Sequence, residues 1–122
     1  MTLKDKAVAF HSKDSNCAQS IMKAMVEYTG FTEETAAALG AGFGNGAGCG
    51  ELCGAISGAI MTIGAALGEG HRDQVKKLTR ELIDSFWGEY NAVRCEDLKA
   101  AKIPCDELIR FAAAKADELL SQ

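Results

Sequence analysis

The chain has 122 residues, of which 48% are hydrophobic and 25% charged, with a formal net charge of −4. This length and composition are typical of one globular domain and exclude an intrinsically disordered segment. We therefore expect a single domain over residues 1–122. Basic side chains cluster only at Arg72, Lys76, Lys77 and Arg80, where acidic residues lie among them. Because no basic face is available to neutralise phosphates, we expect no nucleic-acid partner.

The pattern of charges along the chain also bears on location. Lys4, Asp5 and Lys6 follow the first residues with no apolar stretch after them, which predicts the absence of a secretory signal. The longest uncharged run near the middle, residues 52–67, is rich in glycine and alanine and falls short of the roughly 20 apolar residues of a membrane span. We expect a cytoplasmic protein with no membrane span.

The apolar pattern predicts an all-α fold, a helical bundle of about five to six helices with a glycine-rich loop before a buried central helix. There is a single proline, and few segments alternate between apolar and polar residues, which argues against a sheet. Thr2 is placed to cap a first helix. A second helix begins near Cys17 and ends at Gly30, and Thr32 caps a short third helix over about 33–39.

Glycine dominates the middle of the chain. Residues 40–50 read GAGFGNGAGCG, a density of glycine that predicts a loop rather than a regular helix. A fourth helix over about 52–67, a fifth over about 72–92 and a sixth beginning at Pro104 complete the bundle. Glycines recur at four-residue spacing at the start of the fourth helix, at Gly50, Gly54 and Gly58. This spacing predicts that a neighbouring backbone lies close to that helix.

Five cysteines are many for a chain of this size: Cys17, Cys49, Cys53, Cys95 and Cys105. In a reducing compartment such a set indicates metal binding or redox chemistry rather than structural disulfides. No CxxC pair occurs among them, so their spacing matches no standard zinc or thioredoxin signature. Short connections make consecutive helices antiparallel neighbours. With that alternation, all five cysteines are expected at one end of the bundle.

The predicted positions also bear on thiol reactivity. Cys17, Cys53 and Cys105 each fall in a first helical turn, where the helix N-terminus favours the thiolate. We expect Cys53 to be the attacking thiol, because flanking glycines should leave its surroundings open. The alternative for any single cysteine is that it serves only as a small buried hydrophobe.

Two sequence strings in this chain resemble a known family. These are NCAQ at 16–19 and CGAISG at 53–58, separated by the glycine-rich loop and followed by Cys95 and Cys105. Together they resemble the redox-active protein family with a CGAxxG motif (C_GCAxxG_C_C), over nearly the whole chain. The resemblance implies a cysteine centre, without specifying a reaction, built from four family cysteines: Cys17, Cys53, Cys95 and Cys105. Cys49 is then an extra cysteine.

Three functions remain open at this point. In the first, Cys17, Cys53, Cys95 and Cys105, with or without Cys49, exchange disulfides or electrons with a redox partner protein, a small thiol or an electron carrier. Which cysteines pair is left open. In the second, the same four cysteines bind zinc or an iron–sulfur cluster, with His11 and His71 as additional candidate ligands.

The third function is a non-catalytic binding or scaffold protein, in which the glycine-spaced helix supports a homodimer.

In the family that this chain resembles, related domains can be joined to haem-binding cytochrome segments. The chain contains no CxxCH sequence, and we therefore expect no covalent c-type haem.

Overall fold

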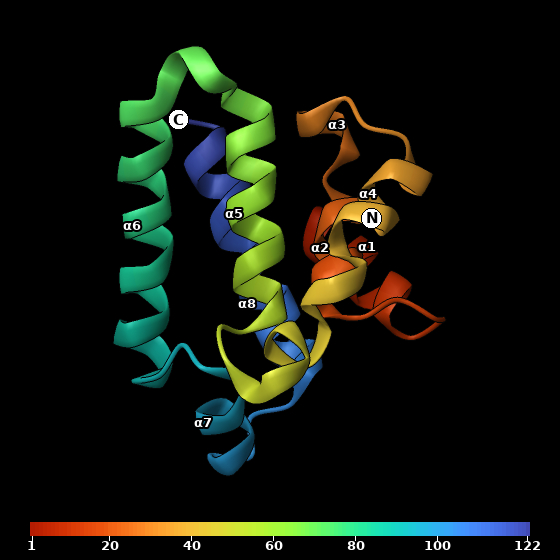
Figure 1. Ribbon diagram of the computed structural model, residues 1–122, viewed down its shortest axis with the longest axis vertical. Coiled ribbons are helices and arrows are strands. Elements are labelled where there is room, and N and C mark those ends of the chain that lie inside the picture. The colour runs from red at the N-terminus through yellow and green to blue at the C-terminus, as the bar shows by residue number, and fades with distance from the viewer.

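The computed structural model describes residues 1–122 and contains eight α-helices, short irregular helical segments and no β-sheet (Figure 1). The all-α prediction is confirmed, although five to six helices were expected. The helices are α1 Leu3–His11, α2 Cys17–Ala24, α3 Val26–Thr29, α4 Glu33–Gly40, α5 Gly54–Leu67, α6 Arg72–Tyr90, α7 Cys95–Ala100 and α8 Cys105–Leu120.

The predicted helix starts are set by side-chain caps. The hydroxyl of Thr2 accepts a hydrogen bond from the Asp5 amide at 3.3 Å, and that of Thr32 accepts one from the Thr35 amide at 3.1 Å. Asn16 begins α2 with a reciprocal capping box to Gln19, which satisfies two amides that a helix end otherwise leaves without a partner. The chain-order prediction of the first three helix starts is therefore confirmed.

Three boundaries differ from those predicted. The second helix is interrupted at Met25, which leaves helical geometry and separates α2 from α3 before Gly30 ends α3 in a left-handed conformation. The short helix α7 was not predicted, because it has six residues and one buried side chain, Leu98, too few to show a helical period. Helix α5 begins at Gly54 rather than at Leu52, since the residues before it are extended.

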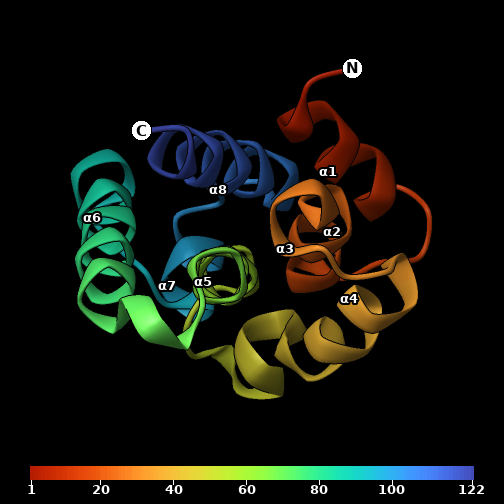
Figure 2. The same ribbon diagram turned by 90° about the horizontal axis from the view of Figure 1, so that it is seen from above.

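Helix α5 is the centre of the bundle. Seen from above in Figure 2, it stands end-on with α6, α8, α2 and α4 around it. It packs against α2, α6 and α8, while α1 packs against α2 and α8. One core of 20 buried residues joins these helices, and its largest fully buried side chains are Phe86, Ile21, Met25, Ile56, Ile63, Leu82, Leu98 and Ile109. The predicted buried central helix is confirmed.

Helix direction decides which residues share an end of the bundle. In Figure 1, α5 rises from the glycine-rich segment, α6 returns to the lower end, and α8 rises again beside α5. The start of α5, the end of α6, all of α7 and the start of α8 therefore lie together at the lower end. None of the helices combines the length and apolarity that crossing a membrane requires.

Candidate functional site: a pocket lined by cysteines

A cavity of about 200 Å³ opens at the lower end of the bundle. Its lining comes from helices distant in the sequence and comprises His11, Asn16, Cys17, Asn45, Cys53, Gly54, Cys95, Leu98, Lys99, Ile103, Cys105 and Leu108. Four of the five cysteines are in this set. They are the four that the sequence resemblance singles out, and all four are free thiols.

Two glycines of α5 bring Cys17 next to this pocket. A Cβ atom placed on Gly54 would lie 2.9 Å from the carbonyl oxygen of Phe43 and 3.2 Å from the Cβ of Cys17. A Cβ atom on Gly58 would lie 2.8 Å from the carbonyl oxygen of Ala18. Any larger residue would push α2 away from α5. The first and last small residues of GAISG thus allow the close helix contact that the spacing predicted.

The glycine-rich turn before α5 positions Cys95. Gly46 has a φ of +62°, and a Cβ atom there would lie 2.6 Å from the amide nitrogen of Glu51 and 2.7 Å from the Cβ of Cys95. Only glycine satisfies both the left-handed backbone and this close approach. Asn45, next to it, is also left-handed, with a φ of 56°. The turn therefore folds back onto the start of α7.

A short antiparallel contact fixes Cys53 beside the segment that carries Cys95. Leu52 and Arg94 form an isolated bridge. The amide of Cys53 donates to the carbonyl of Val93 at 2.9 Å, and the amide of Cys95 donates to the carbonyl of Glu51 at 2.6 Å. These bonds use backbone groups just before α5 and at the start of α7. They also explain why α5 starts later than the sequence predicted.

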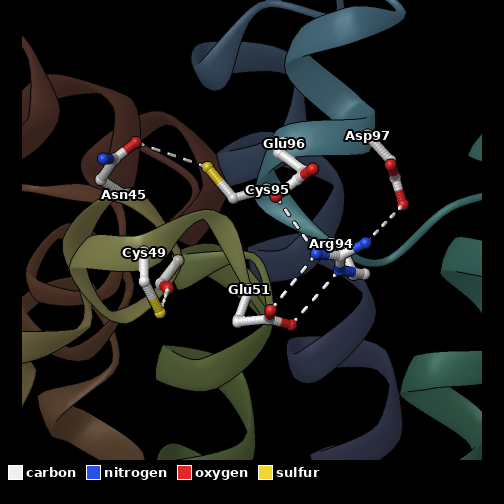
Figure 3. Close-up of polar contacts among 8 residues, drawn as sticks. Asn45, Cys49, Glu51, Arg94, Cys95, Glu96 and Asp97 are labelled. Carbon is white, nitrogen blue, oxygen red and sulfur yellow. Dashed lines mark hydrogen bonds and ion pairs between the residues drawn. The ribbon is translucent and has the colours of Figure 1, made fainter.

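Charged side chains lie on the outer side of the contact between Leu52 and Arg94 (Figure 3). The guanidinium of Arg94 donates two hydrogen bonds of 3.2 Å to the carboxylate of Glu51 and one of 3.1 Å to Glu96. Asp97 lies 3.9 Å from the same guanidinium. The hydrogen bond and charge of Glu51, followed by the charge of Glu96, raise the pKa of Arg94. The ion cluster ties the glycine-rich turn to α7.

Burial determines the direction in which the pKa values of the inner thiols of the pocket are shifted. Cys53 is 3% exposed, and burial raises its pKa although the amides of Ile56 and Ala55 donate hydrogen bonds that lower it. Burial also raises the pKa of Cys17, and the neighbouring Cys105 raises it further. The expectation of thiolate-favouring helix starts is therefore wrong for Cys17 and Cys53, because desolvation outweighs the helix N-terminus.

The expected openness around Cys53 is also wrong. Its neighbour Gly54 does not leave free space, since Phe43 and Cys17 occupy it. Cys95 and Cys105 are half-buried and are reached more easily than Cys53. An attacking thiol must be accessible as well as ionised, so the structure favours these two over Cys53.

Cys49 lies at the same end of the molecule but does not line the pocket. It is exposed, and its thiol donates to the carbonyl of Gly46 at 3.5 Å. In Figure 3 the sulfur of Cys95 points towards Asn45, whereas that of Cys49 lies on the far side of the glycine-rich turn. The predicted gathering of cysteines at one end therefore produces a shared pocket for four of the five.

Sequence reasoning missed two polar groups of the pocket. The Oδ1 atom of Asn45 accepts a hydrogen bond from the thiol of Cys95 at 3.7 Å and another from the ammonium group of Lys99. Lys99 follows Cys95 by four residues, a spacing that places both on one face of a helix. That signal was hidden because α7 itself was not predicted. Asn45 lies in a loop and gives no comparable signal.

The two histidines have different surroundings. His11 ends α1 and lines the pocket, and its Nδ1 atom is 2.8 Å from the Oδ1 atom of Asp106. His71 lies in the 3₁₀ segment Glu69–His71 between α5 and α6, at the opposite end of α5. Among the two candidate ligands, only His11 is near the cysteines.

The side chains of the pocket are not arranged as a metal centre. No group of three or more His, Cys, Asp or Glu residues is placed so that it could hold a metal ion. Structural zinc sites bring four such ligands to about 2.0–2.3 Å from one point. Four of the cysteines line a cavity of about 200 Å³ instead.

The fold and the pocket define a class: an all-α bundle with free thiols from four separate helix starts around one cavity. Residues 15–119 match the family described as Putative redox-active protein (C_GCAxxG_C_C). The chain belongs to this family, and the resemblance noted in the sequence is confirmed. Comparison with curated proteins and with solved structures found no match.

Proposed function

We propose that this protein carries out thiol–disulfide exchange, with the pocket cysteines cycling between dithiol and disulfide. The observation that carries the proposal is the placement of four free thiols on one cavity in a chain of a redox-active family. Among them, Cys17 and Cys105 are the best supported pair, because the side chain of Cys105 contributes both a hydrogen bond and a charge to the raised pKa of Cys17. No other thiol of the pocket has so large an effect on Cys17, which favours Cys105 as its exchange partner.

The two thiols have different roles in this proposal. Cys105 is half-buried at the start of α8 and attacks the disulfide of an oxidised partner, forming a mixed disulfide and releasing one partner thiolate. Cys17, whose thiolate is disfavoured by burial, then attacks the sulfur of Cys105 and releases the second partner thiolate. The protein loses two electrons and the partner disulfide gains them. Cys53 and Cys95 form a second pair, to which the disulfide passes by exchange.

The size of the pocket supports a small or protruding substrate. Pockets for drug-sized ligands are about 300–1,000 Å³, and this cavity is about 200 Å³. It admits a low-molecular-weight disulfide, or the disulfide of a partner protein presented on a loop. A bulky cofactor does not fit without movement of the surrounding helices.

The test is a redox titration of the purified protein in glutathione buffers, with free thiols trapped by alkylation and peptides identified by mass spectrometry. We expect a Cys17–Cys105 disulfide whose population depends on the buffer potential. Cys105→Ser should abolish it, whereas Cys49→Ser, which alters an exposed thiol outside the pocket, should leave it unchanged. Full reduction of all five thiols at every potential would overturn the proposal. Metal retained by anaerobically purified protein would favour the metal-binding alternative.

A further inference from the structure

His11 lines the cysteine pocket and contacts Asp106, which lies 95 residues away in the sequence. It is the last residue of α1, which packs against both α2 and α8. Its side chain is 28% exposed and lines the cavity together with Cys17 and Cys105. The imidazole is therefore partly open to solvent and shares a cavity with the proposed exchanging pair.

Asp106 fixes the orientation of this imidazole. The Nδ1 atom of His11 lies 2.8 Å from the Oδ1 atom of Asp106, the residue that directly follows Cys105 in α8. An ionised carboxylate can only accept a hydrogen bond, so Nδ1 carries the proton and donates it. In the neutral ring this leaves Nε2 as an unprotonated acceptor. The pair thus presents a base whose tautomer is set by the protein.

The pocket needs such a group. Thiol–disulfide exchange proceeds through the thiolate, and the proton of the attacking thiol must be removed while the leaving thiolate gains one. Burial disfavours the thiolate of Cys17. Among the residues lining the cavity, His11 and Lys99 are the nitrogen bases, and Lys99 is hydrogen-bonded to Asn45 beside Cys95. Histidine is the side chain that exchanges protons most readily near neutral pH.

Two basic groups on the helices packed against α1 have other partners. On α8, Arg110 is paired with Asp5 at 2.6 Å. On α2, the ammonium group of Lys23 donates to Ser15 and lies over the ring of Phe10. The charged group in contact with His11 is therefore Asp106, and the titratable groups that share its cavity are the four thiols and Lys99.

We propose that His11, oriented by Asp106, is the proton-transfer residue for disulfide exchange at Cys105 and Cys17. Nε2 takes the proton of the Cys105 thiol as its sulfur attacks the partner disulfide, and the imidazolium returns that proton to the departing partner thiolate. The same ring repeats the transfer when Cys17 attacks the mixed disulfide. Each cycle moves two protons and two electrons from the protein thiols to the partner disulfide. Asp106 is a positioning residue. This inference rests on the proposed function.

The test measures the rate at which reduced protein is oxidised by oxidised glutathione, between about pH 5 and 8, where histidines titrate. Replacing His11 by Gln should slow the reaction about 100-fold at neutral pH and change the pH profile to one that follows the ionisation of the attacking thiol alone. Asp106→Asn should cause a smaller loss of about tenfold, because the amide can accept a hydrogen bond from a protonated Nδ1 or donate one to an unprotonated Nδ1, and so no longer fixes the tautomer. His71→Gln, which changes the other histidine at the far end of α5, is the matched control and should react at the wild-type rate.

The equilibrium position separates this inference from the proposed function. A proton-transfer residue changes the rate alone, so His11→Gln should reach the same dithiol–disulfide ratio in glutathione buffers as the wild type. If His11→Gln folds poorly, His11→Ala with added imidazole replaces it, and imidazole should restore the rate. An unchanged rate and pH profile in the variants, with the Cys17–Cys105 disulfide still forming, would overturn the inference alone. Absence of that disulfide in the wild type would overturn the proposed function.

Discussion

Gly54 and Gly58, near the start of α5, lie directly against the backbone around Phe43 and Ala18. Gly64 and Gly68, near the end of the same helix, have no other atom within 4 Å of an added Cβ. At the first end the missing side chains let two helices meet and bring their cysteines to one pocket. At the second end Gly68 ends the helix with a φ of +83°, and the turn that follows is exposed. Spacing alone does not distinguish these roles, because the neighbouring element decides what a glycine does.

The largest effect that would test this comparison is expected from Gly58→Ala. The new methyl group would lie 2.8 Å from the carbonyl oxygen of Ala18, an atom of the backbone that cannot rotate away. Overpacking of this kind costs about 1–3 kcal/mol of unfolding free energy. We expect a lower urea midpoint with an unchanged slope, together with slower formation of the Cys17–Cys105 disulfide as α2 shifts.

Gly64→Ala is the matched control in the same helix. Its added methyl group meets no other atom within 4 Å, and alanine is favoured over glycine in a helix interior by about 0.5–1 kcal/mol. The urea midpoint should therefore rise. If both variants changed stability in the same direction, the difference between the two ends of α5 would not be one of packing.

Alkaline pH should lower the free energy of unfolding through the buried thiols of the pocket. Burial raises the pKa of Cys17 and Cys53 above the value of 9.0 for a free thiol. Below that value both the folded and unfolded chains keep these protons, and the full stability is present. Above it the unfolded chain releases protons that the folded chain retains, so the free energy of unfolding falls. We expect a loss of up to about 1 kcal/mol per buried thiol between pH 8.5 and pH 10.

Variants identify the source of this pH dependence. Cys17→Ala should make the alkaline loss of stability shallower, whereas Cys49→Ala, at an exposed position, should leave the slope unchanged. Tyr90 adds to the loss near pH 10, because burial raises its pKa to about 12 and the folded chain keeps a proton that the unfolded chain begins to release, but it contributes equally to all these proteins. Identical slopes for wild type and Cys17→Ala, measured by urea unfolding at each pH, would show that desolvation of this thiol does not control the effect.

The sequence was informative about the fold and about which cysteines gather. The all-α class, the caps at Thr2 and Thr32 and the buried central helix follow from short-range signals that the structure confirms. Alternating helix directions were enough to bring the cysteines to one end. These features depend on periodicity and on short connections, which a single sequence displays directly.

Other features of the site depend on contacts between distant segments. The extended pairing of Leu52 with Arg94, which delays the start of α5, leaves no periodic signal. The raised pKa of Cys53 depends on how completely α5 is covered, and its position at the helix start alone predicted the opposite direction. The contact between His11 and Asp106 joins residues 95 positions apart. Tertiary packing, rather than local preference, determines each of these features.

The smallest expected effect concerns the end of the bundle away from the cysteines. The hydroxyl of Tyr28 on α3 donates to the Oδ1 atom of Asp117 at 2.6 Å and lies 2.8 Å from the hydroxyl of Ser121, near the end of α8. The carboxylate of Asp117 raises the pKa of Tyr28. Tyr28→Phe removes these contacts and keeps the ring, so we expect a loss of about 0.5–1 kcal/mol in urea unfolding, at the low end for a hydrogen bond because water competes here.

The same variant also tests whether the two ends act independently. The Tyr28 contacts join α3 to the last turns of α8, whereas Cys105 is the first residue of that helix. Mutations at separate sites without shared partners have additive effects. Tyr28→Phe should therefore leave the rate of Cys17–Cys105 disulfide formation unchanged, and its cost should add to that of Gly58→Ala. A slower rate, or a double variant whose loss differs clearly from the sum, would mean that α8 transmits changes along its length to the thiol pocket.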